Sequence, residues 1–341
     1  MAGNYFPAQA KVSPNFTEPG LIITYAQASG AFRATLPGGD PKVKIGDDDL
    51  FVYVNALDLR TEAVGAQAAG NFLPSVSLVG TFYKTATYLI RNRCLYNHHD
   101  TAAAANYAVA LPAALELAQR QGIFMQERNM LLYGFNAANG EGLMNAAGAT
   151  AVTLPADTYG HTTVRTYDPG QLAIFFLDEI VNLITGMFQS GMPFEVNLLG
   201  PQRILNQMSL AGIVQITSYQ RTGAGTESVS GMIKDMVGRN GGTFNWFYDD
   251  TLIGQGAGGA DALIMTIPEI EVPTMAGINT DAFGNLMPGI NYVNAMYSAF
   301  AAPIKIPTPV PDGGITEVLE TRTTSGWNLR PQGLYILSLP Y

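Results

Sequence analysis

The sequence predicts an α+β fold in which early and late strands share a sheet beside one long helix. Strand-like segments occupy residues 42–95 and return after residue 211, and two long helical patterns lie between them. A helix, a buried strand and a second, shorter helix also follow one another within residues 169–208. No repeat of fixed period is visible in the sequence, so this order favours an α+β plan over a repeat architecture.

Residues 1–40 predict an extended N-terminal arm. They show little periodicity apart from a short strand-like run at residues 21–25, and they contain four prolines, Pro7, Pro14, Pro19 and Pro37. A segment of this kind has little core of its own. We therefore expect it to lie on another part of the subunit or on a neighbour.

A strand-rich region follows the arm. Residues 42–60 predict two strands around a turn at residues 46–49, because Phe51 and Tyr53 alternate with Val52. After a stretch of small residues, β-branched and aromatic side chains dominate residues 76–95. This second run indicates a hairpin or a long strand pair.

The clearest helical pattern covers residues 112–133. Pro112 suits the first turn of a helix, and Gly134 suits its C-terminal cap. One apolar arc of about 140° is interrupted by Gln121 and Arg128, and its members are Ala114, Leu117, Ala118, Phe124, Met125, Leu131 and Leu132. The helix is expected to need cover on two sides, since further apolar side chains lie away from this arc, namely Leu115, Ile123 and Met130.

A glycine-rich loop follows this helix at residues 133–148. Its four glycines stop a helix and permit left-handed backbone conformations; they are Gly134, Gly140, Gly142 and Gly148. Leu143 and Met144 are the bulky apolar residues of the loop after Phe135. We expect them to fix the loop to a core.

The second helix is predicted at residues 169–190, with Asp168 as its N-terminal cap and Gly191 at its end. Its predicted apolar face consists of Ile174, Leu177, Val181, Ile184 and Phe188, and the opposite side carries Asp178, Asn182, Thr185 and Gln189. A buried strand at residues 194–199 and a short helix at residues 202–208 follow. Residues 211–300 are glycine-rich and mainly strand-like, with runs at 243–248, 262–267 and 290–297, and the tail adds strands at 316–321 and 334–339.

Composition favours an assembling protein. Only 13% of the 341 residues are charged and 47% are hydrophobic, so the chain must hide much apolar surface in its core or against neighbours. The net charge of −9, without a Lys/Arg cluster, argues against tight sequence-specific nucleic-acid binding. The single cysteine, Cys94, excludes internal disulfides. Neither a signal peptide nor an apolar run long enough to span a membrane is visible.

Four candidate chemical motifs are explained by turns and loops rather than by functional sites. His98, His99 and Asp100 are interpreted as a solvated turn, and no spacing joins them to His161, the remaining histidine. Residues 254–259 fit G-x-G-x-x-G, but the following residues alternate like a strand, whereas a dinucleotide site needs a helix there. The acidic runs at 47–49 and 249–250 lack calcium-loop spacing. The sequence therefore predicts no enzyme, no catalytic, cofactor-binding or metal-ligating residue, and no cofactor.

The order of elements resembles that of tailed-phage major capsid proteins of the HK97-like fold, over nearly the whole chain. The stretch Gly142-Leu143-Met144-Asn145 is similar to a "Gly-Leu-Leu-Asn" stretch that recurs after the long helix of that family. Residues 69–74, Ala-Gly-Asn-Phe-Leu-Pro, resemble a stretch of a non-crosslinked subgroup. Lys42, Lys44 and Lys84 lie where some relatives crosslink, but nothing distinguishes one of them, and no crosslink is predicted.

The resemblance implies five segments. Residues 1–40 would form the N-terminal arm, and residues 41–95 a strand-rich region with the E-loop hairpin. Residues 96–149 would form the peripheral domain with its long spine helix, and residues 150–300 the axial domain. Residues 301–341 would return to the peripheral domain as strands.

The implied function is that of a major capsid protein, located in the virion and assembled in the host cytoplasm. Copies would form pentamers and hexamers of an icosahedral shell that encloses double-stranded DNA, contacted without sequence specificity and without a membrane. Decoration, scaffolding and portal proteins are further candidate partners. Two alternatives stay open: an encapsulin-type compartment of the same fold, and a metal-dependent enzyme that uses His98, His99 and Asp100.

Overall fold

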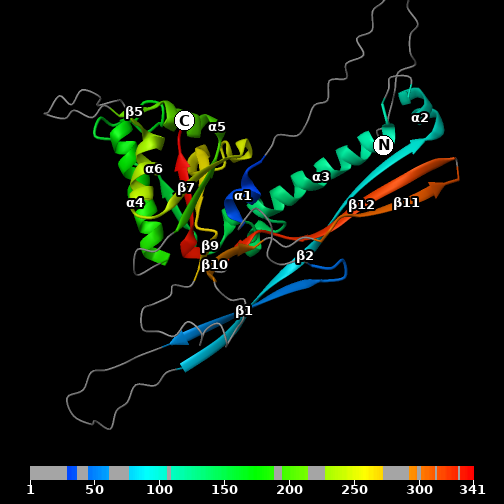
Figure 1. Ribbon diagram of the computed structural model, residues 1–341, viewed down its shortest axis with the longest axis horizontal. Helices are drawn as coiled ribbons and strands as arrows, with labels where there is room; N and C mark the ends of the chain where they lie inside the picture. The colour runs from blue at the N-terminus through cyan, green and yellow to red at the C-terminus, as the bar shows by residue number, and fades with distance from the viewer. Residues whose placement is uncertain are drawn as a thin grey trace, which may run out of the picture.

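Two regions of different shape make up the chain in the computed structural model (Figure 1). A compact lobe is built on a five-stranded sheet, and an elongated region places a four-stranded sheet beside the longest helix. The structure describes residues 29–36, 45–60, 77–105, 109–187, 194–213, 227–271, 292–297, 301–311, 313–328 and 331–341.

The lobe is organised around a mixed sheet in the order β3-β14-β8-β4-β7. β14 runs antiparallel to β8 and parallel to β3, while β4 runs antiparallel to β8 and parallel to β7. The two edges of the sheet are therefore β3 and β7. The five strands span Thr150–Thr153 (β3), Glu195–Gly200 (β4), Thr243–Tyr248 (β7), Asp261–Thr266 (β8) and Leu334–Leu339 (β14).

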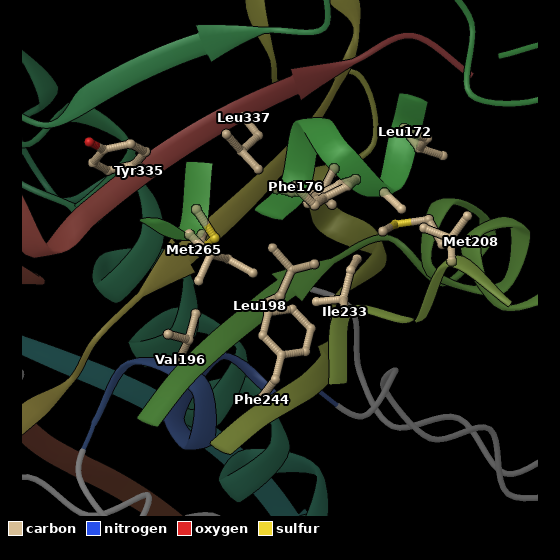
Figure 2. Packing of buried hydrophobic residues seen from close by; sticks show 14 of the residues in the cluster. Leu172, Phe176, Val196, Leu198, Met208, Ile233, Phe244, Met265, Tyr335 and Leu337 are labelled. Atoms are coloured by element: carbon tan, nitrogen blue, oxygen red, sulfur yellow. The ribbon is translucent and has the colours of Figure 1, made fainter. Parts of the chain in front are cut away.

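Both faces of this sheet are covered. Figure 2 shows Phe176 lying over the strands that carry Leu198 and Leu337, in a core shared with three helices. On the opposite face, Leu199 and Ile264 pack with a second set of buried side chains. The helices of the first core are α4 (Pro169–Met187), α5 (Gln202–Leu210) and α6 (Val229–Arg239); the second core is closed by α1 (Ala31–Thr35) and the end of α3 (Leu111–Tyr133).

The elongated region has strand order β1-β2-β12-β11. The 21-residue β2 pairs with β1 from Ser77 to Ala86 and with β12 from Thr87 to Asn97. It therefore changes partner in the middle, and the β1–β2 hairpin projects from the rest of the sheet along β2 (Figure 1). The strands span Phe51–Arg60 (β1), Ser77–Asn97 (β2), Ile304–Val310 (β11) and Gly314–Thr324 (β12).

Helix α2 (His98–Ala105) follows β2 directly, and α3 then runs back beside the sheet. The predicted helix at residues 112–133 is confirmed, but its predicted apolar arc is largely on the wrong side. Ile123 and Met130 are buried, whereas Leu117, Phe124 and Met125 are 41%, 38% and 39% exposed. The helix has two apolar sides, and the period alone does not decide which one meets the sheet.

Buried polar groups explain part of this error. Gln119 is buried against the sheet because its Nε2 donates to the backbone oxygen of Glu317 at 3.0 Å. Arg128, which interrupts the predicted arc, is also buried. A polar residue on the core-facing side of a helix is tolerated where a strand offers it a backbone acceptor, and periodicity analysis misplaces such a residue.

Helix α4 is confirmed, with the Asp168 side chain accepting from the Gln171 amide at 2.9 Å as the predicted cap. Its predicted apolar face is wrong in part, because Ile174 and Val181 are exposed. The buried side consists of Leu172, Ala173, Phe176, Ile180 and Leu183. Phe188 lies outside the described residues.

The strands β4, β7, β8, β10 (Tyr292–Tyr297), β12 and β14 and helix α5 match predicted elements. The elements that were not predicted include α1, α2, β3, α6 and β11. The glycines of α6 favoured a strand-rich interpretation of its segment. β11 carries two prolines, which an edge strand tolerates. Short strands complete the fold at Gly212–Ile213 (β5), Glu227–Ser228 (β6), Glu269–Glu271 (β9) and Trp327–Asn328 (β13).

Several predictions lie outside the described residues. They are the strand at 21–25, the first strand before Gly46 and the 69–74 motif. The described part of the predicted arm contains the short helix α1. The glycine-rich loop, in contrast, is described in full and confirmed: all four of its glycines have positive φ, and Leu143 is completely buried in the second core.

Candidate assembly surfaces

The projecting hairpin carries an aromatic surface that no described residue covers. Phe51, Tyr53 and Phe82 are 45%, 55% and 66% exposed. The register places them on one side of the hairpin, with ring centroids 6.5 Å apart for Phe51 and Tyr53 and 6.0 Å apart for Tyr53 and Phe82. Lys84 places its Nζ 3.7 Å from the centroid of the Phe51 ring, a cation–π contact. We call these four residues the hairpin aromatic surface.

The base of the hairpin is fixed at Thr87, where β2 changes partner. The Thr87 amide donates to Leu50 O at 3.1 Å, and its hydroxyl donates to Asp49 O at 2.5 Å. Arg322 of β12 donates to the same hydroxyl at 3.1 Å. Within the predicted turn, Asp49 Oδ2 accepts from the Gly46 amide at 2.7 Å, so this carboxylate serves the turn itself.

The four-stranded sheet has a second uncovered surface on the side away from α3. Leu89, Leu95, Ile304 and Ile306 are between 39% and 51% exposed there. Arg91 lies among them and pairs with Glu320 at 2.9 Å. A group of exposed apolar side chains on one face of a sheet is typical of a contact with another chain. We call these residues the open sheet face.

The third surface is the outer stripe of α3, made of Leu117, Phe124 and Met125. Phe124 contacts Phe32 of α1, with ring centroids 5.5 Å apart, and the rest of the stripe stays exposed. Glu127 lies nearby on the same helix, and burial raises its pKa to about 7. Burial removes the Glu127 carboxyl group from solvent, which disfavours its charged form.

The glycine-rich loop joins the two regions through Glu141. Tyr88 of β2 donates to Glu141 Oε1 at 2.6 Å, and Ser325 donates to Oε2 at 3.0 Å. Burial, followed by this hydrogen bond, raises the pKa of Tyr88 to about 12, so its hydroxyl remains a donor at neutral pH. The Gly142 amide also donates to Gly326 O at 2.9 Å, which binds the loop to the segment after β12.

The candidate chemical motifs are not assembled into a site. His98 and His99 are exposed in the first turn of α2, rather than in the predicted turn, and Asp100 accepts from the Asn97 amide at 3.3 Å as part of the helix start. His161 pairs instead with the buried Asp157 at 2.9 Å. In the described ranges, no group of three or more His, Cys, Asp or Glu side chains is placed to hold a metal ion.

The remaining motifs have structural roles. Residues 254–259 contain one short 3-10 turn, Ala257–Gly259, and lead into strand β8, so no α-helix begins there to bind a dinucleotide phosphate. The Asp249 carboxylate accepts from the Thr251 amide at 2.9 Å and caps a short turn. None of the helices in the described part is long and apolar enough to cross a bilayer.

Sequence reasoning missed these three exposed surfaces, although a signal for one of them was present. Residues 51–54 are apolar or aromatic on both faces of the strand, as in a strand that is covered on both sides. The structure leaves the Phe51 and Tyr53 side uncovered and buries Val52.

No family model and no curated protein matches the sequence. Solved structures match almost the whole chain. The capsid of Myoviridae phage XM1 gives a TM-score of 0.64 at 10% identity and covers 95% of this chain and 96% of its own. A structure from Gordonia phage Cozz gives 0.56 at 16% identity, covering 96% and 91%. One from Mycobacterium phage Adephagia gives 0.55 at 11% identity, covering 99% of both chains.

These similarities extend over the lobe and the elongated region together, so the shared property is the arrangement of elements rather than particular side chains. The predicted α+β class and its HK97-like architecture are confirmed at that level. The chain has the HK97-like fold of phage major capsid proteins.

Proposed function

We propose that the chain is a major capsid protein that assembles into a closed icosahedral shell around double-stranded DNA. The observation that carries this proposal is the hairpin aromatic surface, which projects from the body with three aromatic rings exposed. The chain also has the fold of solved phage capsid structures over almost its full length. Exposed aromatic surface on a projecting element is costly in a lone subunit and useful in an assembly.

The hairpin needs a neighbour for a simple energetic reason. A two-stranded hairpin is at best marginally stable in water. Burial of apolar surface contributes about 25 cal/mol per Å², so covering three aromatic side chains on a neighbour offsets that deficit. The open sheet face and the outer stripe of α3 offer further apolar area for other contacts. Three separate surfaces suit a shell, in which each copy meets several neighbours.

The five proposed segments are the arm (1–40), the strand-rich region with the E-loop hairpin (41–95), the peripheral domain (96–149), the axial domain (150–300) and the return strands (301–341). One boundary is better drawn differently. β11 and β12 pair within the elongated sheet, whereas β14 pairs with β8 in the lobe. We therefore assign residues 334–339 to the axial domain.

Further copies of the chain are the main proposed partners, as pentamers and hexamers. Decoration, scaffolding and portal proteins are additional candidates. A net charge of −9 supports loose, sequence-independent contact with the enclosed DNA rather than a tight grip on it. The proposed location is the virion, after assembly in the host cytoplasm, and no cofactor is required.

Electron microscopy of the purified protein tests this function. Closed particles tens of nanometres across that contain nuclease-protected DNA would support it, when the protein is produced with its packaging partners. A stable monomer or dimer at high concentration would overturn it. Particles that hold a co-purifying enzyme instead of DNA would favour the encapsulin-type alternative. Replacing His98, His99 and Asp100 by alanine is expected to leave particle formation unchanged.

A further inference from the structure

Strand β7 is an edge of the lobe sheet with unused backbone groups. The amide of Thr243 donates to Phe194 O at 2.8 Å and that of Asp249 to Gly200 O at 3.0 Å, so odd-numbered residues of β7 face β4. In a parallel pair the alternate residues then direct their backbone N–H and C=O groups away from the neighbouring strand. In β7 these residues are Phe244, Trp246 and Tyr248. Among the described residues, only the Gly30 amide pairs with these outward backbone groups, donating to Tyr248 O at 2.9 Å.

A groove of about 410 Å³ runs along this edge. Its floor is β7, and its wall is formed by Ser209 of α5 and by Ser230 and Lys234 of α6. That volume lies within the range of about 300–1,000 Å³ found for ligand-binding sites. The groove is therefore large enough for a short extended segment of polypeptide.

The groove contains a buried hydrogen-bond donor for which the described part of the chain offers no acceptor. Trp246 Nε1 is buried, and no described residue accepts a hydrogen bond from it. A buried donor without a partner costs about 1–3 kcal/mol, so an acceptor supplied from outside is favoured. Lys234 is exposed at the rim and forms no ion pair with a described residue. Together they select a segment with a free carbonyl oxygen and an acidic side chain.

The edge also requires a cover. Residues 243–248, Thr-Phe-Asn-Trp-Phe-Tyr, carry no charge and no proline, and four of the six are aromatic. An uncovered edge strand of this composition pairs with other chains indiscriminately. Lysine or proline on the strand itself, a common protection of such edges, is missing here.

We propose that this groove receives an extended, acidic segment of a neighbouring copy of the chain, which adds a strand to β7. The proposal rests on the proposed shell function, because a shell keeps such a neighbour permanently in place. Charge complementarity supports the occupant: the groove offers a lysine, and the chain has 27 acidic against 18 basic residues. The segment's carbonyl oxygen accepts from Trp246 Nε1, and its carboxylate pairs with Lys234.

Hydrogen exchange on the unmodified chain tests the contact directly. The outward amides of Phe244, Trp246 and Tyr248 are expected to exchange much more slowly in particles than in dissociated subunits. Quenching by acrylamide gives a second readout, because the chain has two tryptophans and the Trp327→Phe variant keeps only Trp246. Its quenching constant is expected to fall severalfold on assembly.

A charge reversal separates the groove from the rest of the lobe. Lys234→Glu is expected to raise the subunit concentration needed for assembly about tenfold, the effect of losing one interfacial charge pair. Arg239→Glu on the same helix lies outside the groove and serves as the control. The amide exchange rates of β7 and the quenching constant of Trp246 could also be the same in particles as in dissociated subunits. That result would overturn the groove contact and leave the shell function standing. Failure to form any particle would overturn both.

Discussion

The lobe and the elongated region differ in how completely they bury their apolar side chains. The lobe covers both faces of its sheet, and its core side chains, such as Phe176, Leu198 and Ile264, have no exposed area. In the described part of the elongated region, buried residues form two small clusters, around Val52 and around Tyr96. Many of its apolar side chains are exposed instead. The lobe thus buries both faces of its sheet within one chain, whereas the elongated region leaves much of its apolar surface exposed.

This difference predicts which substitutions affect the stability of the subunit and which affect its assembly. Substitutions in the lobe core act on the free energy of unfolding of the subunit. Substitutions on the exposed face of the elongated sheet act on the free energy of association. The two quantities are measured independently, so each substitution below tests whether its region has been assigned correctly.

The largest effect is expected for Phe176→Ala in the lobe. Phe176 is completely buried, and removal of a buried phenylalanine ring costs about 3–5 kcal/mol of stability. The matched change Phe82→Ala, at a side chain that is 66% exposed, is expected to shift stability by no more than about 0.5 kcal/mol. Urea denaturation of dissociated subunits measures both. Equal losses would show that the hairpin is as well packed as the lobe.

The second effect concerns the loop that joins the regions. Gly142 has φ 86°, and a Cβ there would lie 2.3 Å from Gly134 N. Gly160 has φ 85° but open space around it. Gly160→Ala therefore reports the left-handed strain alone, about 1 kcal/mol. Gly142→Ala is expected to cost at least about 2 kcal/mol more because backbone must move. Similar midpoints in thermal unfolding would contradict the close packing of this junction.

The third effect is on assembly. Phe82→Ala is expected to weaken association by about 2 kcal/mol per contact, the size of an interface anchor. The critical concentration for particle formation, measured by sedimentation, would then rise more than tenfold. Leu210→Ala, at a side chain that is 78% exposed on the lobe, is the control. A larger effect at Leu210 would reverse the assignment of the two regions.

The smallest effect is a dependence on pH. The raised pKa of Glu127, about 7 in the folded chain, means that the folded state binds a proton more tightly than the unfolded state. Stability is then lost as pH rises from about 4.5 through 7. Glu127→Gln removes this loss and is expected to stabilise the subunit by about 1 kcal/mol at pH 8, allowing for partial exposure, with no gain at pH 4. A gain that is equal at both pH values would argue against a desolvated carboxylate.

Much of the lobe could be predicted from the sequence because its signals are local. Asp168 and Pro169 mark the start of α4, and the segment at 194–199, rich in bulky apolar residues, marks a strand covered on both faces. Helix α6 was missed although Val229, Ile233 and Val237 have helical spacing and Ser228 accepts from the Gly231 amide at 3.1 Å. The glycines of that segment led to a strand prediction despite the helix cap at Ser228.

The elongated region was predicted less well because its burial is set by contacts between distant segments, and much of its apolar surface stays exposed. On α3 the exposed Phe124 and the buried Ile123 are equally apolar, so sequence alone does not tell which side meets the sheet. Gln119 is buried by a hydrogen bond to a strand nearly two hundred residues away. The hairpin aromatic surface was not predicted because alternation identifies the two faces of a strand, not which of them the fold leaves bare.

The change of partner along β2 has a mechanical consequence. Antiparallel hydrogen bonds lie across the strands, so tension along β2 loads the pairs with β1 and β12 in shear rather than one after another. Thr87 stands where one set of pairs ends and the other begins. A pull on the β1–β2 hairpin therefore travels as a tensile load along one continuous strand into the rest of the sheet.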